Sequence, residues 1–286
     1  MSKERNGHSA RRPRARRPGE LWRYAVAAAL AAVVLVPFGW ALRLSLERTF
    51  TTLPAVFPGV DALTLENYTR LLHFTPFLRW VANSAVFAGG VTALNLLLAP
   101  MAGYALARGR IRGAGVIFWG ILVLWIIPFQ VLLLPLYLFL VRVGLVDTYA
   151  GLILPLAVDP LAIFIMRQYL LSVPKEYEEA GMIDGCSRVR AFFQVVLPLC
   201  TPALMAVAVV TFVFTWGNLI YPLVMTSRES MATLTVGVAG FAYGSIVDWG
   251  MTMAATLLGA LPTVALFLAL NRWFMEGMTF AGGVRG

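Results

Sequence analysis

Six long apolar stretches divide the chain, and each is long enough to cross a membrane as a helix. They cover residues 21–42, 80–106, 115–141, 149–171, 199–225 and 251–273. A hydrocarbon core of about 30 Å needs about 20 helical residues, and a helix satisfies its own backbone hydrogen bonds inside lipid. The pattern therefore predicts an all-α protein with six transmembrane helices in a lipid bilayer. Prolines inside the stretches are expected to mark helix kinks that neighbouring helices stabilise, at positions 128, 135, 155, 160 and 262.

The polar segments around these stretches define the expected organisation of the chain. Residues 1–20 form an Arg- and Pro-rich tail without apolar periodicity, which predicts disorder. The stretch 21–42 is too long for a cleaved signal peptide and lacks a small-residue cleavage site, so we expect an uncleaved first transmembrane helix. An external loop at 43–76 follows, then a core of spans two to six at 77–271 and a C-terminal tail at 272–286.

The most polar insert between two spans is residues 173–198, here called the central loop. It holds four of the fourteen acidic residues, and such charge density cannot lie in hydrocarbon. Pro174 suits a first helical turn, and Asp184-Gly185 interrupts the helix-forming run. Ser187 can cap a second short helix that runs through Val196. The sequence predicts two short helices bent at a glycine, forming a compact knob suited to a partner's cleft.

Basic residues predict the orientation of the chain. With the N-terminus inside, the inner segments carry 17 of the 23 lysines and arginines. Because cytoplasmic loops are enriched in these residues, both termini and the central loop are expected in the cytoplasm.

Composition excludes several other classes of protein. The chain is 59% hydrophobic and only 13% charged, about half the charge of an ordinary soluble domain. Its net charge of +9 lies in the N-terminal tail and in loops, so we expect it to orient the chain in a membrane and to bind no nucleic acid. Cys186 and Cys200 have no metal-ligand spacing, and no metal site is predicted.

The central loop carries a motif of a known family. Glu179-Ala180-Gly181, three residues, Gly185, nine residues and then Val195-x-Leu197-Pro198 resembles the E-A-A-x-x-x-G-x9-I-x-L-P signature of ABC importer membrane subunits. Gly181 replaces the second Ala and Val195 replaces Ile. Asp184-Gly185 and Phe192 look like the form found in carbohydrate importers. An ordinary amphipathic cytoplasmic loop is the alternative interpretation.

The resemblance extends from about residue 65 to residue 286. Pro128-Phe-Gln130, Gly151-Leu-Ile-Leu-Pro155 and Trp216-Gly-Asn218 look like motifs of sugar-importer permeases, and residues 272–286 look like the end of a maltose/maltodextrin-type permease. The resemblance implies the type I ABC importer permease fold and a bacterial plasma membrane location. It also implies a complex with a second permease that is a different chain, a cytoplasmic ABC ATPase dimer and an extracytoplasmic solute-binding protein.

The chain has no G-x-x-x-x-G-K-[ST] loop, so we expect it to be non-enzymatic and to bind no cofactor, with ATP and Mg²⁺ held by the partner ATPase. The central loop is expected to fit that ATPase as a ball fits a socket, with Gly185 as its bend and Ala180 and Gly181 allowing close backbone approach. Glu178 and Glu179 can accept hydrogen bonds from the partner or from nearby backbone; helix solubility and compensation of the helix dipole are the alternative explanation. The expected coupling residues are Glu178, Glu179, Ala180, Gly181, Asp184, Gly185, Val195, Leu197 and Pro198.

Polar residues inside spans are candidates for a translocation route, because they are costly in lipid and tend to face the interior of a bundle. Asp159 is the strongest, since its carboxylate can accept hydrogen bonds from sugar hydroxyls; satisfaction by a neighbouring helix is the alternative. Asn95, Gln130, Trp216 and Asn218 are weaker, because each can instead hold helices together.

Four other functions remain to be weighed. A non-transport scaffold would not need broken spans or a loop shaped for a socket. An ion-coupled secondary transporter would use intramembrane acids or histidines, and only Asp159 lies in a span. An intramembrane enzyme needs a nucleophile and a base, but His8 and His73 lie in the tail and an outer loop. An ABC permease for a solute other than a sugar is the nearest alternative to a sugar importer.

Overall fold

The computed structural model describes residues 18–47, 63–109, 111–241 and 247–282. These residues are almost entirely helical, apart from an isolated β-bridge between Glu47 and Leu63. Three helices are long enough to cross a membrane alone: α1 (Pro18–Ser45), α3 (Phe77–Arg108) and α14 (Trp249–Gly282). The all-α prediction is confirmed.

The remaining helices are shorter and often follow one another after a sharp bend. They are α2 (Glu66–Phe74), α4 (Ala114–Ile126), α5 (Phe129–Arg142), α6 (Tyr149–Ile153), η1 (Leu154–Leu156), α7 (Pro160–Ser172), α8 (Glu176–Ile183), α9 (Arg188–Ala191), η2 (Phe192–Val196), α10 (Leu197–Leu199), α11 (Thr201–Trp216), α12 (Ile220–Met225), η3 (Glu229–Met231) and α13 (Leu234–Gly240).

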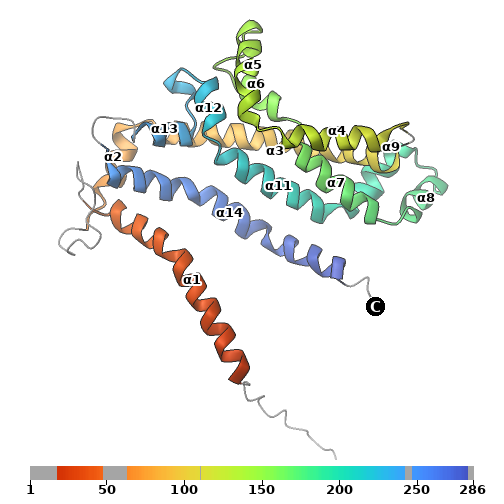
Figure 1. Cartoon of the computed structure of the whole chain (residues 1–286), viewed down its shortest axis with the longest axis horizontal. Helices are drawn as coiled ribbons and strands as arrows, with labels where there is room; N and C mark the ends of the chain where they lie inside the picture. Colours follow the sequence, from red (N-terminus) through yellow and green to blue (C-terminus); the bar gives the residue numbers. More distant parts are fainter. Residues whose placement is uncertain (1–17, 48–62, 110, 242–246, 283–286) are drawn as a thin grey trace, which may run out of the picture.

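The centre of the molecule is a bundle in which α3 packs against α7 and α11, and α11 packs against α14 (Figure 1). Its core includes the buried side chains of Met166, Leu170, Val196 and Val207. α2 and α13 lie at one end of this bundle, and α8 lies at the opposite end. The bundle therefore separates the central loop from the end that carries α2.

Three pairs of helices meet at sharp bends, two of them inside predicted spans and the third where the central loop joins the predicted span 199–225. The paired helices meet at 93° for α4 and α5, at 42° for α6–η1 and α7, and at 76° for the helix Arg188–Leu199 and α11. If each pair is one span, the described residues hold up to six. Proline explains the first two bends, because Pro128 and Pro160 have no backbone N–H to continue the preceding helix.

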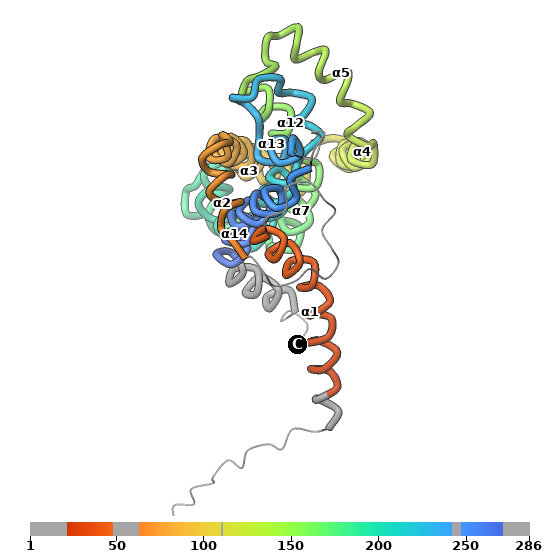
Figure 2. Tube along the Cα trace, turned by 90° about the vertical axis from the view of Figure 1, so that its left-hand side faces the viewer, coloured from red at the N-terminus to blue at the C-terminus, as the bar shows by residue number. Residues whose placement is uncertain are grey.

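Two predicted spans differ from the structure. The stretch 115–141 is not one helix, since α5 leaves the bundle at the bend and projects from it (Figures 1 and 2). The stretch 199–225 is also divided: α11 ends at Trp216, and α12 begins only at Ile220. Gly217 lies at this break. The apolar residues continue on both sides of it, so hydropathy alone does not predict that the helix ends there.

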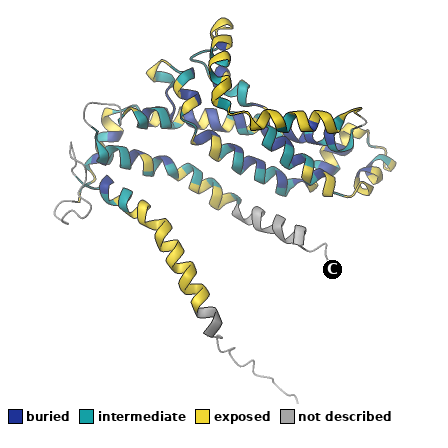
Figure 3. Cartoon of the chain, viewed as in Figure 1, coloured by how far each residue is buried: buried dark blue, intermediate teal, exposed yellow. Residues whose placement is uncertain are grey.

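α1 diverges from the bundle over most of its length. Residues 22–39 are exposed along every side of the helix (Figure 3), whereas Leu44 and Ser45 at its end are buried beside α14. An apolar helix exposed on all sides needs lipid or another membrane protein around it.

The predicted boundaries differ from the observed ones at both ends. The first transmembrane helix begins at Pro18 and continues to Ser45, beyond the expected 21–42. α14 continues through Gly282, so most of the expected tail at 272–286 is helical. Residues 1–17 and 283–286 lie outside the described part, and the expected disorder of 1–20 falls mainly there.

Candidate coupling and translocation sites

The central loop forms two helices joined by a tight turn. α8 ends at Ile183, and Gly185 in the turn has a φ of +90°, in the region that favours glycine. The backbone N–H of Cys186 donates to the Gly181 carbonyl at 3.0 Å, which closes the end of α8. Ser187 then accepts from the Arg190 N–H at 3.4 Å and begins the helix Arg188–Leu199. The expected pair of short helices bent at a glycine is confirmed.

Gly181 brings these two helices together. It is buried, and a Cβ at this position would lie 3.2 Å from Val195 Cγ2 and 3.8 Å from Ala191 Cβ. The close approach expected of Gly181 is thus an approach within the chain. Ala180, one residue earlier, is exposed.

Glu178 faces the interior of the molecule. Its side chain is buried, and its carboxylate accepts from the Tyr104 hydroxyl at 2.5 Å and from Arg108 Nη1 at 3.1 Å. Arg108 Nη2 also donates to the backbone carbonyls of Leu170 and Val173, at the end of α7. The donors to Glu178 are therefore side chains of α3, not the backbone or partner donors expected from sequence.

The exposed side of the central loop carries other residues of the motif. Glu179, Ala180, Asp184, Gly185 and Pro198 are exposed, while Val195 and Leu197 are half-buried. Glu178 and Glu179 are neighbours, yet about 100° of helical rotation sends one inward and the other outward. A partner protein would meet Glu179 and Ala180 rather than Glu178.

A cavity of about 570 Å³ lies where the bent spans meet α3 and α11. Asp159, Asn95 and Asn218 line it, so the structure brings together three of the five predicted translocation residues. Trp125, Phe129 and Phe214 supply aromatic walls. Residues at two bends line the cavity: those after the end of α4 at Ile126 and those before the start of α7 at Pro160.

The polar residues of this cavity have different hydrogen-bonding states. Asn95 is fully buried: it donates to the Leu156 and Val91 carbonyls at 2.9 and 3.0 Å, and accepts from the Asp159 N–H at 2.8 Å. It therefore holds the break between η1 and α7 together. Asp159 caps α7, since its Oδ1 accepts from the Leu161 N–H at 2.9 Å. Asn218 Oδ1 accepts from the Tyr221 N–H at 3.2 Å.

Comparison with known proteins identifies the family. The family described as "Binding-protein-dependent transport system inner membrane component" matches residues 96–280, more than half of the chain. The chain belongs to this family. The arabinooligosaccharides transport system permease protein AraQ of Halalkalibacterium halodurans is 38% identical over 231 residues, covering 79% of this chain and 81% of that protein. The sn-glycerol-3-phosphate transport system permease protein UgpE of Yersinia pestis bv. Antiqua is 33% identical over 206 residues, covering 71% and 73%.

A solved structure supports the same architecture for this permease. A chain of a bacterial ABC transporter involved in the import of the acidic polysaccharide alginate superposes with a TM-score of 0.73. The match covers 92% of this chain and 100% of that chain at 21% identity, and so bears on the fold alone. The predicted family and importer fold are confirmed. The permease is a multi-pass membrane component of a transport system, which disfavours the ion-coupled transporter and the intramembrane enzyme.

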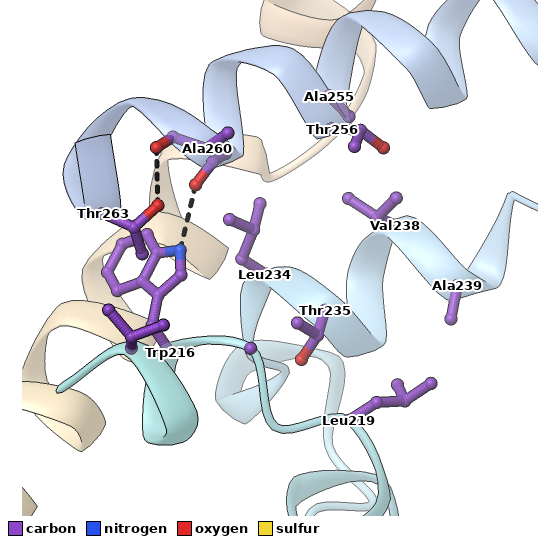
Figure 4. A pocket seen from close by; sticks show the side chains of 13 residues that line it. Trp216, Leu219, Leu234, Thr235, Val238, Ala239, Ala255, Thr256, Ala260 and Thr263 are labelled. Carbon is purple, nitrogen blue, oxygen red and sulfur yellow. Dashed lines mark hydrogen bonds between the residues drawn. The ribbon is translucent and has the colours of Figure 1, made fainter. Parts of the chain in front are cut away.

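Trp216 and Gln130, the other two predicted translocation residues, do not line the cavity that contains Asp159. Trp216 lines a second, largely apolar cavity of about 560 Å³ between α11, α13 and α14 (Figure 4). Its Nε1 donates to the Gly259 carbonyl at 2.9 Å, which joins α11 to α14 and fits the alternative role of interhelical packing. Gln130 is exposed on α5 and lines neither cavity.

Sequence reasoning missed several residues of both sites. Tyr104 and Arg108 anchor Glu178, and their spacing of four on one helix was a signal of a shared face. Thr211 and Thr215 line the first cavity from α11, again four residues apart. Apolar spans commonly contain threonine, so hydropathy did not distinguish these two.

Proposed function

We propose that this permease is one of two membrane subunits of an ATP-driven, binding-protein-dependent importer. A separate cytoplasmic ABC ATPase dimer, carrying ATP and Mg²⁺, engages the exposed side of the central loop. Both termini and the central loop lie in the cytoplasm, in accord with the distribution of basic residues. An extracytoplasmic solute-binding protein delivers substrate to the opposite end of the bundle.

The observation that carries this proposal is the buried connection between the central loop and α3. Tyr104 and Arg108 hold Glu178 of α8 at the inner end of α3. Tyr104 also packs on Phe192 of the second helix, with ring centroids 4.6 Å apart. If flexible backbone alone joined the central loop to the spans, the loop could move without moving them. Here side chains of α3 fix the central loop to a long helix.

The same helix reaches the cavity and the outer end of the bundle. Asn95 of α3 fixes the chain break that holds Asp159. Nearer the other end, Asn83 donates to the Ser230 and Ala232 carbonyls at 3.0 and 2.7 Å. Closure of the ATPases can therefore act on the cavity and on the segment that contains Ser230 and Ala232 through α3 as a rigid body, in the manner of other rigid-body transitions.

A carbohydrate is the proposed substrate. Two relatives are named as arabinooligosaccharide permeases, of which the one from Bacillus subtilis is 33% identical over 227 residues. The cavity combines aromatic walls with threonine and asparagine side chains, a mixture suited to the apolar faces and hydroxyls of a sugar. A solute that is not a sugar is the second candidate, because a relative is named for sn-glycerol-3-phosphate.

The exposed apolar helices are consistent with a second permease subunit. α1 is exposed along residues 22–39, and α5 projects with Val131, Leu134 and Phe139 between 58% and 66% exposed. Surfaces of this kind are covered by lipid or by another membrane-embedded chain.

Mild-detergent purification of the tagged permease from its native membrane, followed by mass spectrometry, tests the assembly. We expect a P-loop ATPase and a second permease to accompany it, and the complex in proteoliposomes to take up arabinotriose when ATP and the solute-binding protein are supplied. A chain that elutes alone and folded even after crosslinking, or uptake that needs no ATP, would contradict the proposal.

A further inference from the structure

We infer that the Asp159 cavity admits uncharged polyhydroxy compounds and rejects anions such as sugar phosphates and uronates. The inference rests on the proposed function and specifies its substrate class. It concerns a choice that the named relatives leave open, since they include systems for arabinooligosaccharides and for sn-glycerol-3-phosphate.

The charge of the cavity comes from one residue. Among the described residues that line it, Asp159 is the only one with an ionisable side chain. Oδ1 of this carboxylate accepts from the Leu161 N–H, and no described residue donates to Oδ2. The second oxygen is therefore available to a hydroxyl donor and repels a second negative charge.

The neutral lining residues suit hydroxyl groups. Thr211 is 4% exposed, and its Oγ1 has no hydrogen-bond partner among the described residues. A buried hydroxyl without a partner is costly unless a ligand or water satisfies it. Thr215 of α11 and Asn218 of the break after it add further polar side chains, and Trp125 and Phe129 of the bent α4–α5 pair line the same cavity.

Features that commonly bind anions are blocked or lie elsewhere. The N-terminus of the 13-residue helix α7 reaches the cavity, but the Asp159 carboxylate already caps it and opposes its positive end. Arg167 of the same helix does not line the cavity, since its guanidinium lies 4.0 Å from the centre of the Phe118 ring. Arg108 is engaged by Glu178.

Thiol modification measures the selectivity without a substrate. Val158 lines the cavity beside Asp159 and is 53% exposed, so Val158→Cys offers a thiol there in a Cys186→Ser, Cys200→Ala background. The full complex is treated with a cationic and an anionic methanethiosulfonate, and the ratio of their rates is measured. The test variant is Asp159→Asn, compared with the same protein that keeps Asp159. Asparagine caps a helix as well as aspartate does but carries no charge, so the comparison changes the charge alone.

We expect Asp159→Asn to lower the cationic-to-anionic rate ratio by about a hundredfold, because a unit charge roughly 10 Å from the thiol at an effective dielectric constant of about 20 changes each rate by about tenfold, in opposite directions for the two reagents. Raising the salt concentration should lower the ratio of the Asp159 form in the same direction, which tests the inference even if the Asn variant folds poorly. A ratio that neither substitution nor salt changes would overturn it. This experiment needs neither ATP nor transport. An unchanged ratio with intact ATP-driven uptake contradicts the inference about the cavity alone. Loss of ATP-driven uptake with the expected ratio contradicts the proposed function alone.

Discussion

At the scale of single residues, Glu178 and Glu179 divide two tasks between neighbouring positions. Glu178 is paired with Arg108 at 3.1 Å, and both side chains are at most 10% exposed. Glu179, about 100° further round α8, is exposed. We therefore expect substitutions of Glu178 to affect stability and substitutions of Glu179 to affect only coupling.

Glu178→Ala should destabilise the folded permease by about 3 kcal/mol, because removing one member of a buried ion pair leaves Arg108 charged and unpaired. The measurement is the thermal unfolding of the purified complex in nanodiscs. Glu179→Ala is the control and should unfold near the wild-type temperature. Equal unfolding temperatures for the two variants would contradict the assigned roles.

Glu179→Lys should abolish ATP-driven uptake while leaving the amount of permease in the membrane unchanged. The reason is that the reversed charge lies on the surface proposed to meet the ATPase, away from the internal contacts of α8. Uptake is compared with immunoblots of the membrane fraction. Normal uptake in this variant would remove Glu179 from the coupling surface.

Gly185→Pro should uncouple uptake, because a φ of +90° is closed to proline, whose φ is near −65°. Gly185→Ala should show a weaker defect, with about 1 kcal/mol of strain. Gly115→Ala in α4 is the control, since a Cβ there meets nothing within 4 Å and its φ is not positive. If both Gly185 variants transport normally, the bend is not needed for coupling.

At the scale of elements, apolar length predicted where the spans lie but not how they bend. α3 matches its predicted stretch within three residues at each end, and α14 covers its stretch but continues to Gly282, because each is one helix through a continuous apolar run. A kink at Pro128 was expected, but its size of 93° was not, since proline permits a kink and the surrounding helices decide how large it is. The sequence predicted Asp159 and Asn218 because a polar side chain inside a span is costly in lipid. The roles of Thr211 and Arg108 depend on which residues lie next to them in the folded chain, which the sequence does not show.

Gly103→Leu should separate α3 from α7. A Cβ at Gly103 would already lie 3.0 Å from the Arg167 backbone nitrogen and from Met166 Cβ, so a larger side chain costs about 2 kcal/mol through overpacking. Gly120→Leu is the control, because Gly120 is exposed with nothing within 4 Å of its Cβ. Thermal unfolding and uptake should both fall for Gly103→Leu alone, and a stable, active variant would show that α3 and α7 can move apart freely.

At the scale of the whole molecule, α3 joins three levels that a transporter must move together. Its polar side chains contact Glu178 of the central loop, the backbone between η1 and α7 beside the cavity, and the segment that contains Ser230 and Ala232. α1 and α5 meanwhile extend away from the bundle (Figure 2). The fold thus has a compact core, which we propose transmits the motion of the ATPases, and exposed helices, which we propose contact the second permease.

Site-specific photocrosslinking tests the central claim, that the outward side of α8 meets the ATPase. A benzoylphenylalanine placed at Ala180 in the intact complex should give an adduct that mass spectrometry identifies as the P-loop ATPase. The same residue placed at Trp119 of α4, which is 67% exposed, should give no such adduct. An Ala180 variant that never crosslinks to the ATPase, or a Trp119 variant that does so equally, would contradict the account.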